Sequence, residues 1–350
     1  MSLWRITLWF VAWIGLMMGI AGCGRSRGAA PATATPTVTM TPAPTATSTP
    51  IPTPTITPSP TPHPLAEYTI EAMRRRIYPG GKIEIRAVVT RTEAYTRYLI
   101  AYPSDGLTIT GVMQVPHGRG PFPVIILNHG YIPPSRYVPG SDTWRPADYL
   151  ARRGYITLAP DFRGWAGSDS GPDFFRMGLV IDALNLISSI PSIPQADPKR
   201  VGMWGHSMGG GVTTRALVID PRIRAAVLYA PVSADLVNTR RWLGGFRTIE
   251  DPFLAQAYAD ARSDPAFLRQ VSPIYYFHYV SAPVQIHQGT ADTTTPPEWA
   301  QAIRDALVAA GKDVEYFEYP GQGHAFQGQA WTLFLRRMTS FFDQHLKGSR

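Results

Sequence analysis

Residues 201–210 read Val-Gly-Met-Trp-Gly-His-Ser-Met-Gly-Gly, an apolar run that passes into Gly-x-Ser-x-Gly and then into a helical pattern. A serine in such a strand-to-helix turn adopts a strained backbone, which makes its oxygen stand clear of the sheet. Gly205 and Gly209 remove side chains that would clash in this turn. The helix that begins near Met208 directs its positive end at the same point. This context predicts that Ser207 is a nucleophile.

Short apolar runs alternate with amphipathic stretches on both sides of this motif. The alternation is typical of an α/β fold, in which helices cover both faces of a mostly parallel sheet. Nine strands are predicted, at residues 83–89, 97–101, 110–115, 124–128, 156–159, 201–204, 225–229, 284–287 and 314–318. Helical periodicity appears at residues 142–153, 174–190, 208–219, 298–310 and 331–345. Turn-like segments join the first three strands, so we expect an antiparallel edge on an eight- or nine-stranded sheet.

One segment interrupts this alternation of strands and helices. The connection at about residues 233–280 is much longer than usual and is rich in aromatic side chains. We predict a small helical cap here. Most of its aromatic side chains should form the core of the cap, and a few should face the site.

A nucleophilic serine needs a base, and the base needs a carboxylate that fixes its tautomer. Residues 288–296, after the eighth predicted strand, contain Asp292, and residues 319–326, after the ninth, contain His324 among glycines. The chain order serine, acid, histidine is one of the known triad orders. We therefore predict a catalytic triad of Ser207, Asp292 and His324.

Other residues compete for the roles of acid and base. Asp235 follows the strand predicted at residues 225–229 and is the alternative acid, although it could also serve as a helix amino-terminal residue. His345 lies near the carboxyl end of a predicted helix, where it can interact with the helix dipole. His278 and His287 lie in or beside the cap and a strand. Their positions make them weaker candidates for the base.

Residues 95–346 resemble the α/β-hydrolase superfamily and are similar to its dienelactone-hydrolase and prolyl-oligopeptidase-like branch. Three motifs in order carry the resemblance: Asn128-His129-Gly130, Asp161-Phe162-Arg163-Gly164-x-x-Gly167-x-Asp169 and Gly205-His206-Ser207-Met208-Gly209-Gly210. The resemblance implies an α/β-hydrolase fold. It also implies that Asp161 and Arg163 brace the site rather than react, and that the His129 side chain is structural.

The same resemblance implies an oxyanion hole built from backbone amides. The turn at His129 and Gly130 would supply one amide, from Tyr131, and Met208 would supply the other. True prolyl oligopeptidases carry an amino-terminal β-propeller where this sequence has a stalk, so we expect an esterase before a peptidase.

The amino-terminal segment has the layout of a secretory signal, because Arg5 precedes an uninterrupted apolar stretch. Residues 20–23, Ile-Ala-Gly-Cys, resemble the bacterial lipobox, in which the cysteine receives lipid and becomes the mature amino terminus. An uncleaved transmembrane helix is the alternative, because residues 4–21 approach the length needed to span a bilayer. We predict a signal peptide at residues 1–22 and a lipid on Cys23.

Residues 31–64 consist almost entirely of Pro, Thr, Ala and Ser and contain no charged group. This composition favours extended polyproline conformations and cannot bury a core. We therefore predict a lipid-anchored stalk at residues 23–64 and a catalytic domain at residues 65–350. The domain should lie on the extracytoplasmic side of the cell membrane.

Charge and cysteine content exclude several classes of partner. The formal net charge is +8, but no run of Lys and Arg with interleaved aromatics appears, so we expect no nucleic-acid partner. Cys23 is the single cysteine, which rules out an intramolecular disulfide and a multi-cysteine metal site. With no His-Glu-x-x-His motif, we predict no metal and no cofactor.

The predicted site is suited to two-step acyl transfer, in which the serine attacks an ester carbonyl and water releases the acid. A small-molecule ester is the expected substrate. An exopeptidase or amidase acting on a short peptide with the same triad is the alternative, and turnover of an aminoacyl anilide would distinguish it. A non-catalytic surface-binding lipoprotein is a third hypothesis, against which stands a competent residue at each triad position.

Overall fold

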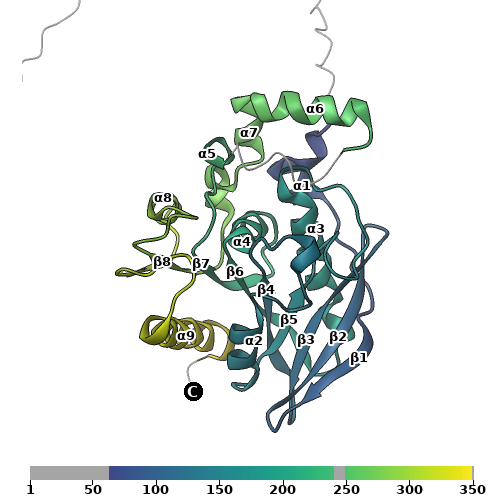
Figure 1. Ribbon diagram of the computed structural model, residues 1–350, viewed down its shortest axis with the longest axis vertical. Coiled ribbons are helices and arrows are strands. Elements are labelled where there is room, and N and C mark those ends of the chain that lie inside the picture. The colour runs from purple at the N-terminus through teal and green to yellow at the C-terminus, as the bar shows by residue number, and fades with distance from the viewer. Residues whose placement is uncertain (1–62, 240–248, 349–350) are drawn as a thin grey trace, which may run out of the picture. The chain divides into compact units, whose positions relative to one another are not determined.

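A mixed nine-stranded sheet runs through the computed structural model, which describes residues 63–239 and 249–348 (Figure 1). The strands, in sheet order, are β1 (Glu84–Arg91), β2 (Tyr95–Ser104), β3 (Leu107–Pro116), β5 (Ile156–Pro160), β4 (Phe122–Asn128), β6 (Ala196–His206), β7 (Ile223–Tyr229), β8 (Val284–Gly289) and β9 (Val314–Tyr319). All nine predicted strands are present. Strands β1 to β3 pair antiparallel, as predicted, and every pair from β5 to β9 is parallel.

Helices cover both faces of the sheet. They are α1 (Ile70–Arg75), α2 (Trp144–Ala151), α3 (Met177–Ser189), α4 (Met208–Ile219), α5 (Leu236–Thr239), α6 (Pro252–Ser263), α7 (Pro265–Gln270), α8 (Pro297–Ala309) and α9 (Gly328–Phe342). Shorter turns are η1 (Ala66–Tyr68), η2 (Pro134–Arg136), η3 (Phe174–Arg176), η4 (Ile190–Ser192), η6 (Pro273–Tyr279) and the π-helix η7 (Asp343–Lys347). Figure 1 shows α2 and α9 on one face and α3, α4 and α8 on the other. Every residue of β5 and β8 is buried, as expected of parallel strands covered on both faces.

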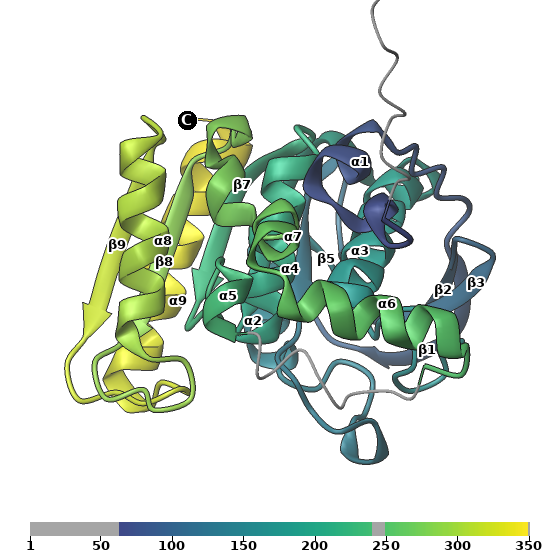
Figure 2. The same ribbon diagram turned by 90° about the horizontal axis from the view of Figure 1, so that it is seen from above.

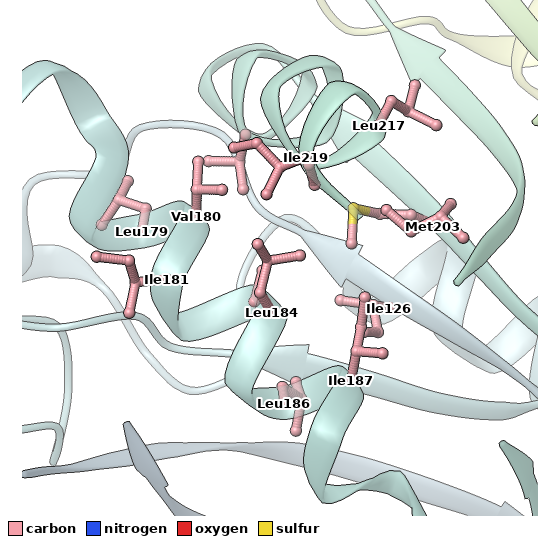
Figure 3. Close-up of a cluster of buried hydrophobic side chains, with 14 of the residues drawn as sticks. Ile126, Leu179, Val180, Ile181, Leu184, Leu186, Ile187, Met203, Leu217 and Ile219 are labelled. Carbon is pink, nitrogen blue, oxygen red and sulfur yellow. The ribbon is translucent and has the colours of Figure 1, made fainter. Parts of the chain in front are cut away.

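The core beside the serine turn is built by α3 and α4 (Figure 3). Leu184 and Ile187 of α3 lie over the sheet beside Ile126 of β4 and Met203 of β6, and all four are buried. Burial of each such side chain contributes about 1.5–3 kcal/mol. This layer therefore packs α3 against β4 and β6. The helical run Phe174–Ser192 is long and apolar enough to cross a membrane. However, 83% of its most apolar 18-residue stretch is buried inside the protein, as in a core helix.

The segment between β7 and β8 is helical, as predicted for the cap. It contains α5, α6, α7 and η6, and Figures 1 and 2 show α6 and α7 on the same side of the sheet as α3 and α4. Asp251 and Asp264 cap α6 and α7 by accepting hydrogen bonds from backbone amides. Phe267 and Tyr258 pack on Phe175, with ring centroids 5.5 and 4.9 Å apart. These aromatic side chains therefore pack the cap onto η3, which lies outside the cap, whereas we expected such side chains to form a core within the cap.

Two local features differ from the sequence expectation. Sequence periodicity does not predict η1 and α1, because α1 has only six residues and rests on Thr69, whose hydroxyl accepts from the Ala72 amide at 3.3 Å. The helix expected at residues 174–190 is broken near its start, because Phe175 and Arg176 have φ of 54° and 66°. The regular helix therefore begins at Met177.

Several predictions fall outside the described residues. These are the signal peptide at residues 1–22, the lipid on Cys23 and nearly all of the stalk, up to residue 62. Two aromatic residues of the predicted cap, Trp242 and Phe246, also lie outside them.

Candidate active site

Ser207 occupies the turn between β6 and α4. Its backbone has φ 53° and ψ −116°, a conformation that residues other than glycine rarely adopt. Ser207 stands at the amino terminus of α4. The turn is held on both sides, because the Ser207 amide donates to the Tyr229 carbonyl at 3.0 Å and the Ser207 carbonyl accepts from Gly211 at 3.2 Å. Close packing explains the flanking glycines. A Cβ at Gly205 would meet the Gly209 backbone, and one at Gly209 would meet the Asn128 backbone.

Asp292 and His324 form a hydrogen-bonded pair. His324 Nδ1 lies 2.8 Å from Asp292 Oδ2, and the carboxylate also accepts from the backbone amides of Thr294 at 2.8 Å and Thr295 at 2.9 Å. Burial raises the pKa of the Asp292 carboxyl, but the hydrogen bonds from His324 and Thr295 outweigh it and lower the pKa to about 2. The carboxylate is therefore ionised at neutral pH and can accept a hydrogen bond from His324 Nδ1–H.

The three predicted triad residues reach the same edge of the sheet. Ser207 follows β6, Asp292 follows β8 and His324 follows β9, and these parallel strands are neighbours through β7. Carboxyl ends of parallel strands share one edge. The serine turn and the His324 loop also touch, because the rings of His206 and His324 lie 4.7 Å apart between centroids.

The alternative acid lies in a different setting. Asp235 Oδ1 accepts a hydrogen bond of 3.0 Å from the Val237 amide, and its Oδ2 accepts one of 3.2 Å from the Tyr275 hydroxyl. Both contacts belong to the cap, which fits the interpretation of Asp235 as a helix amino-terminal residue.

The alternative bases also have structural environments. His287 is fully buried, with its ring nitrogens 2.8 Å from the Tyr319 hydroxyl and 2.7 Å from Gln285 Oε1. The His278 ring packs on Tyr279 at 4.1 Å, and the His345 ring packs on Phe341 at 4.7 Å. These contacts explain each histidine by packing or by hydrogen bonds within the core.

The turn after β4 touches the serine from the other side. A Cβ added to Gly130 would lie 3.3 Å from the Ser207 Cβ. His129 is buried, and its Nδ1 lies 2.7 Å from the Gly130 carbonyl oxygen, which belongs to the same peptide unit as the Tyr131 amide. Because the carbonyl and amide of a trans peptide point in opposite directions, this bond orients the Tyr131 N–H away from His129. The His129 side chain is therefore structural, as expected.

The Asp161 and Arg163 side chains are braced from below. Arg163 forms a buried ion pair of 2.8 Å with Asp182, and the Asp161 carboxylate accepts from the hydroxyls of Tyr137 at 2.8 Å and Thr110 at 2.7 Å. These contacts fit a bracing role. Among residues 63–239 and 249–348, no group of three or more His, Cys, Asp or Glu side chains could hold a metal ion.

Sequence reasoning missed a second aspartate–histidine pair. Asp142 lies in the loop before α2, and both of its carboxylate oxygens are 2.9 Å from His206 Nδ1. The available signal was His206 itself, a histidine directly before the predicted nucleophile. Nothing in the sequence pointed to its partner, which lies 64 residues earlier.

Comparison with known proteins identifies relatives. Residues 142–349 match the Prolyl oligopeptidase family, Peptidase S9. A Bacillus subtilis (strain 168) protein named "Uncharacterized peptidase YuxL" is 27% identical over 69% of this chain and 38% of its own length. A Yersinia pestis protein named "Putative carboxymethylenebutenolidase" is 26% identical over 69% of this chain and 86% of its own length. The chain thus spans well under half of the Bacillus relative and most of the Yersinia one.

Solved structures share the fold. Acetyl xylan esterase 1 from Thermoanaerobacterium sp. JW/SL YS485 superposes with a TM-score of 0.59 at 20% identity, over 81% of this chain and 94% of that one. A puromycin-hydrolyzing peptidase of Mycobacterium tuberculosis gives a TM-score of 0.58 at 22% identity, over 74% of this chain and 41% of that one. The same fold therefore carries enzymes named as esterases and as peptidases.

Proposed function

The chain belongs to the prolyl oligopeptidase family of serine hydrolases, and from this premise we propose that it cleaves ester bonds of small substrates. In this proposal Ser207 is the nucleophile, His324 the base and Asp292 the residue that orients the base.

The backbone of Ser207 gives the proposal its main support. A non-glycine residue at φ 53° costs about 1–3 kcal/mol and persists only where its surroundings enforce it. Here the strained turn follows β6, at the sheet edge that also carries the loops of Asp292 and His324. A protein that only bound ligands would gain nothing from this arrangement, which argues against the non-catalytic hypothesis.

The proposed reaction is a two-step acyl transfer. His324 Nε2 accepts the proton of the Ser207 hydroxyl as its oxygen attacks the ester carbonyl, and the same proton then passes to the leaving alcohol. Water attacks the acyl-enzyme next, with His324 accepting its proton, and that proton passes to the Ser207 oxygen as the acyl bond breaks and the acid leaves. Asp292 holds the Nδ1–H throughout, so that Nε2 remains the nitrogen that exchanges protons.

Backbone amides would hold the negative charge that develops on the carbonyl oxygen. The Met208 amide lies in the first turn of α4, where amides have no partner within the helix. The Tyr131 amide lies in the turn against Ser207 and is oriented by His129. Each such donor typically lowers the barrier by about 3 kcal/mol.

Peptide cleavage is the second candidate, and the family match favours it specifically. An exopeptidase or amidase would use the same residues. Esters come first because an alcohol leaves more readily than an amine, so the same triad is sufficient for them with less assistance.

The test is turnover by the full-length protein of p-nitrophenyl esters of increasing acyl length, beside aminoacyl anilides. Ester turnover that disappears in Ser207→Ala supports the proposal. Anilide turnover at a comparable kcat/KM would assign the peptidase instead, and no turnover of either class would refute both.

We also propose that the enzyme is anchored to the cell membrane by a lipid on Cys23, with its catalytic domain on the extracytoplasmic side. The charged start, the apolar stretch and the Ile-Ala-Gly-Cys of residues 20–23 support this. Residues 23–64 would then be a stalk between membrane and enzyme.

A further inference from the structure

A second aspartate–histidine pair connects the two loops that flank the serine. His206 Nδ1 lies 2.9 Å from each carboxylate oxygen of Asp142, and its Nε2 lies 3.2 Å from the His324 carbonyl oxygen. Asp142 Oδ2 also accepts a hydrogen bond of 2.7 Å from the Gly130 amide. The pair thus joins the turn after β4 to the loop after β9, and Ser207 directly follows His206 between them.

Both ring nitrogens of His206 face acceptors. A carbonyl oxygen and an ionised carboxylate accept hydrogen bonds but cannot donate them. An imidazolium, with a hydrogen on each ring nitrogen, would donate to both acceptors. Burial raises the pKa of the Asp142 carboxyl, but the charge and hydrogen bond of His206 and the amide of Gly130 outweigh it and lower the pKa. Asp142 is thus ionised at neutral pH.

The groups around His206 come from four elements. Asp142 faces it from the loop before α2, the Tyr229 ring of β7 stacks on it at 4.4 Å, and the rings of His206 and His324 lie 4.7 Å apart. Burial lowers the pKa of His206, but the charge and hydrogen bond of Asp142, the His324 carbonyl and the more distant charge of Asp292 together raise it. Burial raises the pKa of the Tyr229 phenol, which therefore adds no charge.

We propose that Asp142 and His206 are positioning residues. Their charged pair holds the turn after β4 and the loop after β9 around Ser207, so that turnover requires His206 to keep its proton. This inference rests on the proposed function of Ser207. Neither side chain needs to touch substrate, because Asp142 acts through Gly130 and His206 acts through His324.

The close fit of the loops makes this positioning effective. A Cβ at Gly130 would lie 3.2 Å from His206 Nδ1 and 3.3 Å from the Ser207 Cβ, so a small shift of the turn would reach the serine. Asp142 itself has φ 68°, in the left-handed region. Asp tolerates this region better than most residues, and here it directs the carboxylate to both partners.

Loss of the proton from His206 would leave one N–H for two acceptors. Because the folded-state pKa of His206 is raised, the complete pair is present below that pKa and is lost as the pH rises through it. We expect kcat to fall on this alkaline side. KM should change little, because the pair positions reacting groups rather than the bound substrate.

The decisive measurement is the pH dependence of kcat and KM for ester hydrolysis by the full-length protein. In Asp142→Asn the alkaline fall of kcat should move to lower pH by about one unit or more, because the partner charge is gone. In His206→Gln that fall should vanish, with kcat reduced about tenfold or more at neutral pH and KM within about threefold of wild type. Asp148→Asn is the matched control, because this half-buried carboxylate of α2 pairs with Arg152 and Tyr95 and not with His206, and it should leave the fall in place. An alkaline fall at the wild-type pH in Asp142→Asn overturns the inference.

Nitrogen NMR of the His206 ring provides a readout that needs no turnover. The signals are assigned by their loss in His206→Gln. We expect imidazolium shifts at pH 7 in the wild type and neutral shifts in Asp142→Asn. A neutral His206 ring in the wild type at pH 7 would overturn the inference. Ester turnover that survives Ser207→Ala would instead refute the proposed function and leave the NMR result standing.

Discussion

Asp292 is held by its own loop before it holds His324. The Thr294 and Thr295 amides bind Asp292 Oδ1 at 2.8 and 2.9 Å, while Oδ2 lies 2.8 Å from His324 Nδ1. Oδ2 also accepts from the Thr295 hydroxyl at 2.7 Å, so both oxygens are held by the loop and one of them also contacts the imidazole. An acid anchored in this way can orient the base without moving during the reaction.

The hydrogen bonds to Asp292 should make stability depend on acid pH. Its pKa is lowered to about 2, against about 3.9 for an unfolded Asp, so ionised Asp292 contributes about 2–3 kcal/mol. This contribution is fully present above the unfolded pKa and is lost as the pH falls through the folded one. The free energy of unfolding should be larger for the wild type than for Asp292→Asn, and this difference should shrink as the pH falls from 5 to 2.5. Chemical denaturation of both proteins measures it. A constant difference over this range would contradict the assignment.

Ser207 should be the residue that a fluorophosphonate probe labels, because it is the proposed nucleophile and stands in a strained turn at the amino terminus of α4. Ser207→Ala should abolish labelling while the far-ultraviolet circular dichroism spectrum stays unchanged. Labelling is followed by gel fluorescence and by mass spectrometry of the modified peptide. Ser233, which bonds within the cap, is a suitable control, and Ser233→Ala should label at the wild-type rate. Labelling at full rate in Ser207→Ala would assign the nucleophile elsewhere.

Gly209→Ala should damage both folding and activity, because the new methyl group would meet the Asn128 backbone, which cannot move aside as a side chain could. The expected loss is about 3 kcal/mol or more of unfolding free energy. Gly154→Ala is the control: it has open space but φ 81°, so it should cost about 1–2 kcal/mol and leave activity intact. Thermal melting and ester turnover check both variants. Equal losses in the two would show that packing at Gly209 is unimportant.

Cys23 should be the mature amino terminus and carry lipid, because it follows the Ile-Ala-Gly of residues 20–22. Mass spectrometry of the amino-terminal peptide from membranes measures this directly. Cys23→Ser should abolish the lipid modification, so that the lipid-modified amino-terminal peptide is no longer found in membranes. An intact Met1, or cleavage elsewhere without lipid, would rule out the anchor.

The sheet edge that carries the candidate site could be predicted, because the strand topology alone determines it. Once β6, β8 and β9 are parallel, the loops that carry Ser207, Asp292 and His324 must leave from the same edge. Strand order and spacing are encoded in short apolar runs, which sequence patterns reveal well. The positions of the three predicted triad residues are therefore the part of the site that sequence patterns predict best.

The Asp142–His206 pair could not be predicted, for a physical reason. Its geometry depends on the path of the long loop after β4, which in turn depends on a left-handed backbone at Asp142 and on the contact of Asp142 with Gly130. Periodicity contains no information about such a path. The break at Phe175, just before α3, could not be predicted for the same reason, because a positive φ at a non-glycine residue is imposed by tertiary packing.

Asp292, rather than Asp235, should orient His324, and a pair of conservative variants separates the two acids. Asp292→Asn keeps the shape of the side chain but no longer fixes the tautomer of His324, so turnover should fall by about four orders of magnitude while substrate binding is retained. Asp235 accepts from the Val237 amide and the Tyr275 hydroxyl inside the cap. Its replacement by Asn keeps an oxygen that can accept from the Val237 amide, so stability should change little and kcat should stay near the wild-type value. Steady-state kinetics and thermal melting on both variants decide the matter. If Asp235→Asn abolishes turnover at unchanged stability while Asp292→Asn stays active, the acid comes from the loop after β7 and the proposed triad is wrong.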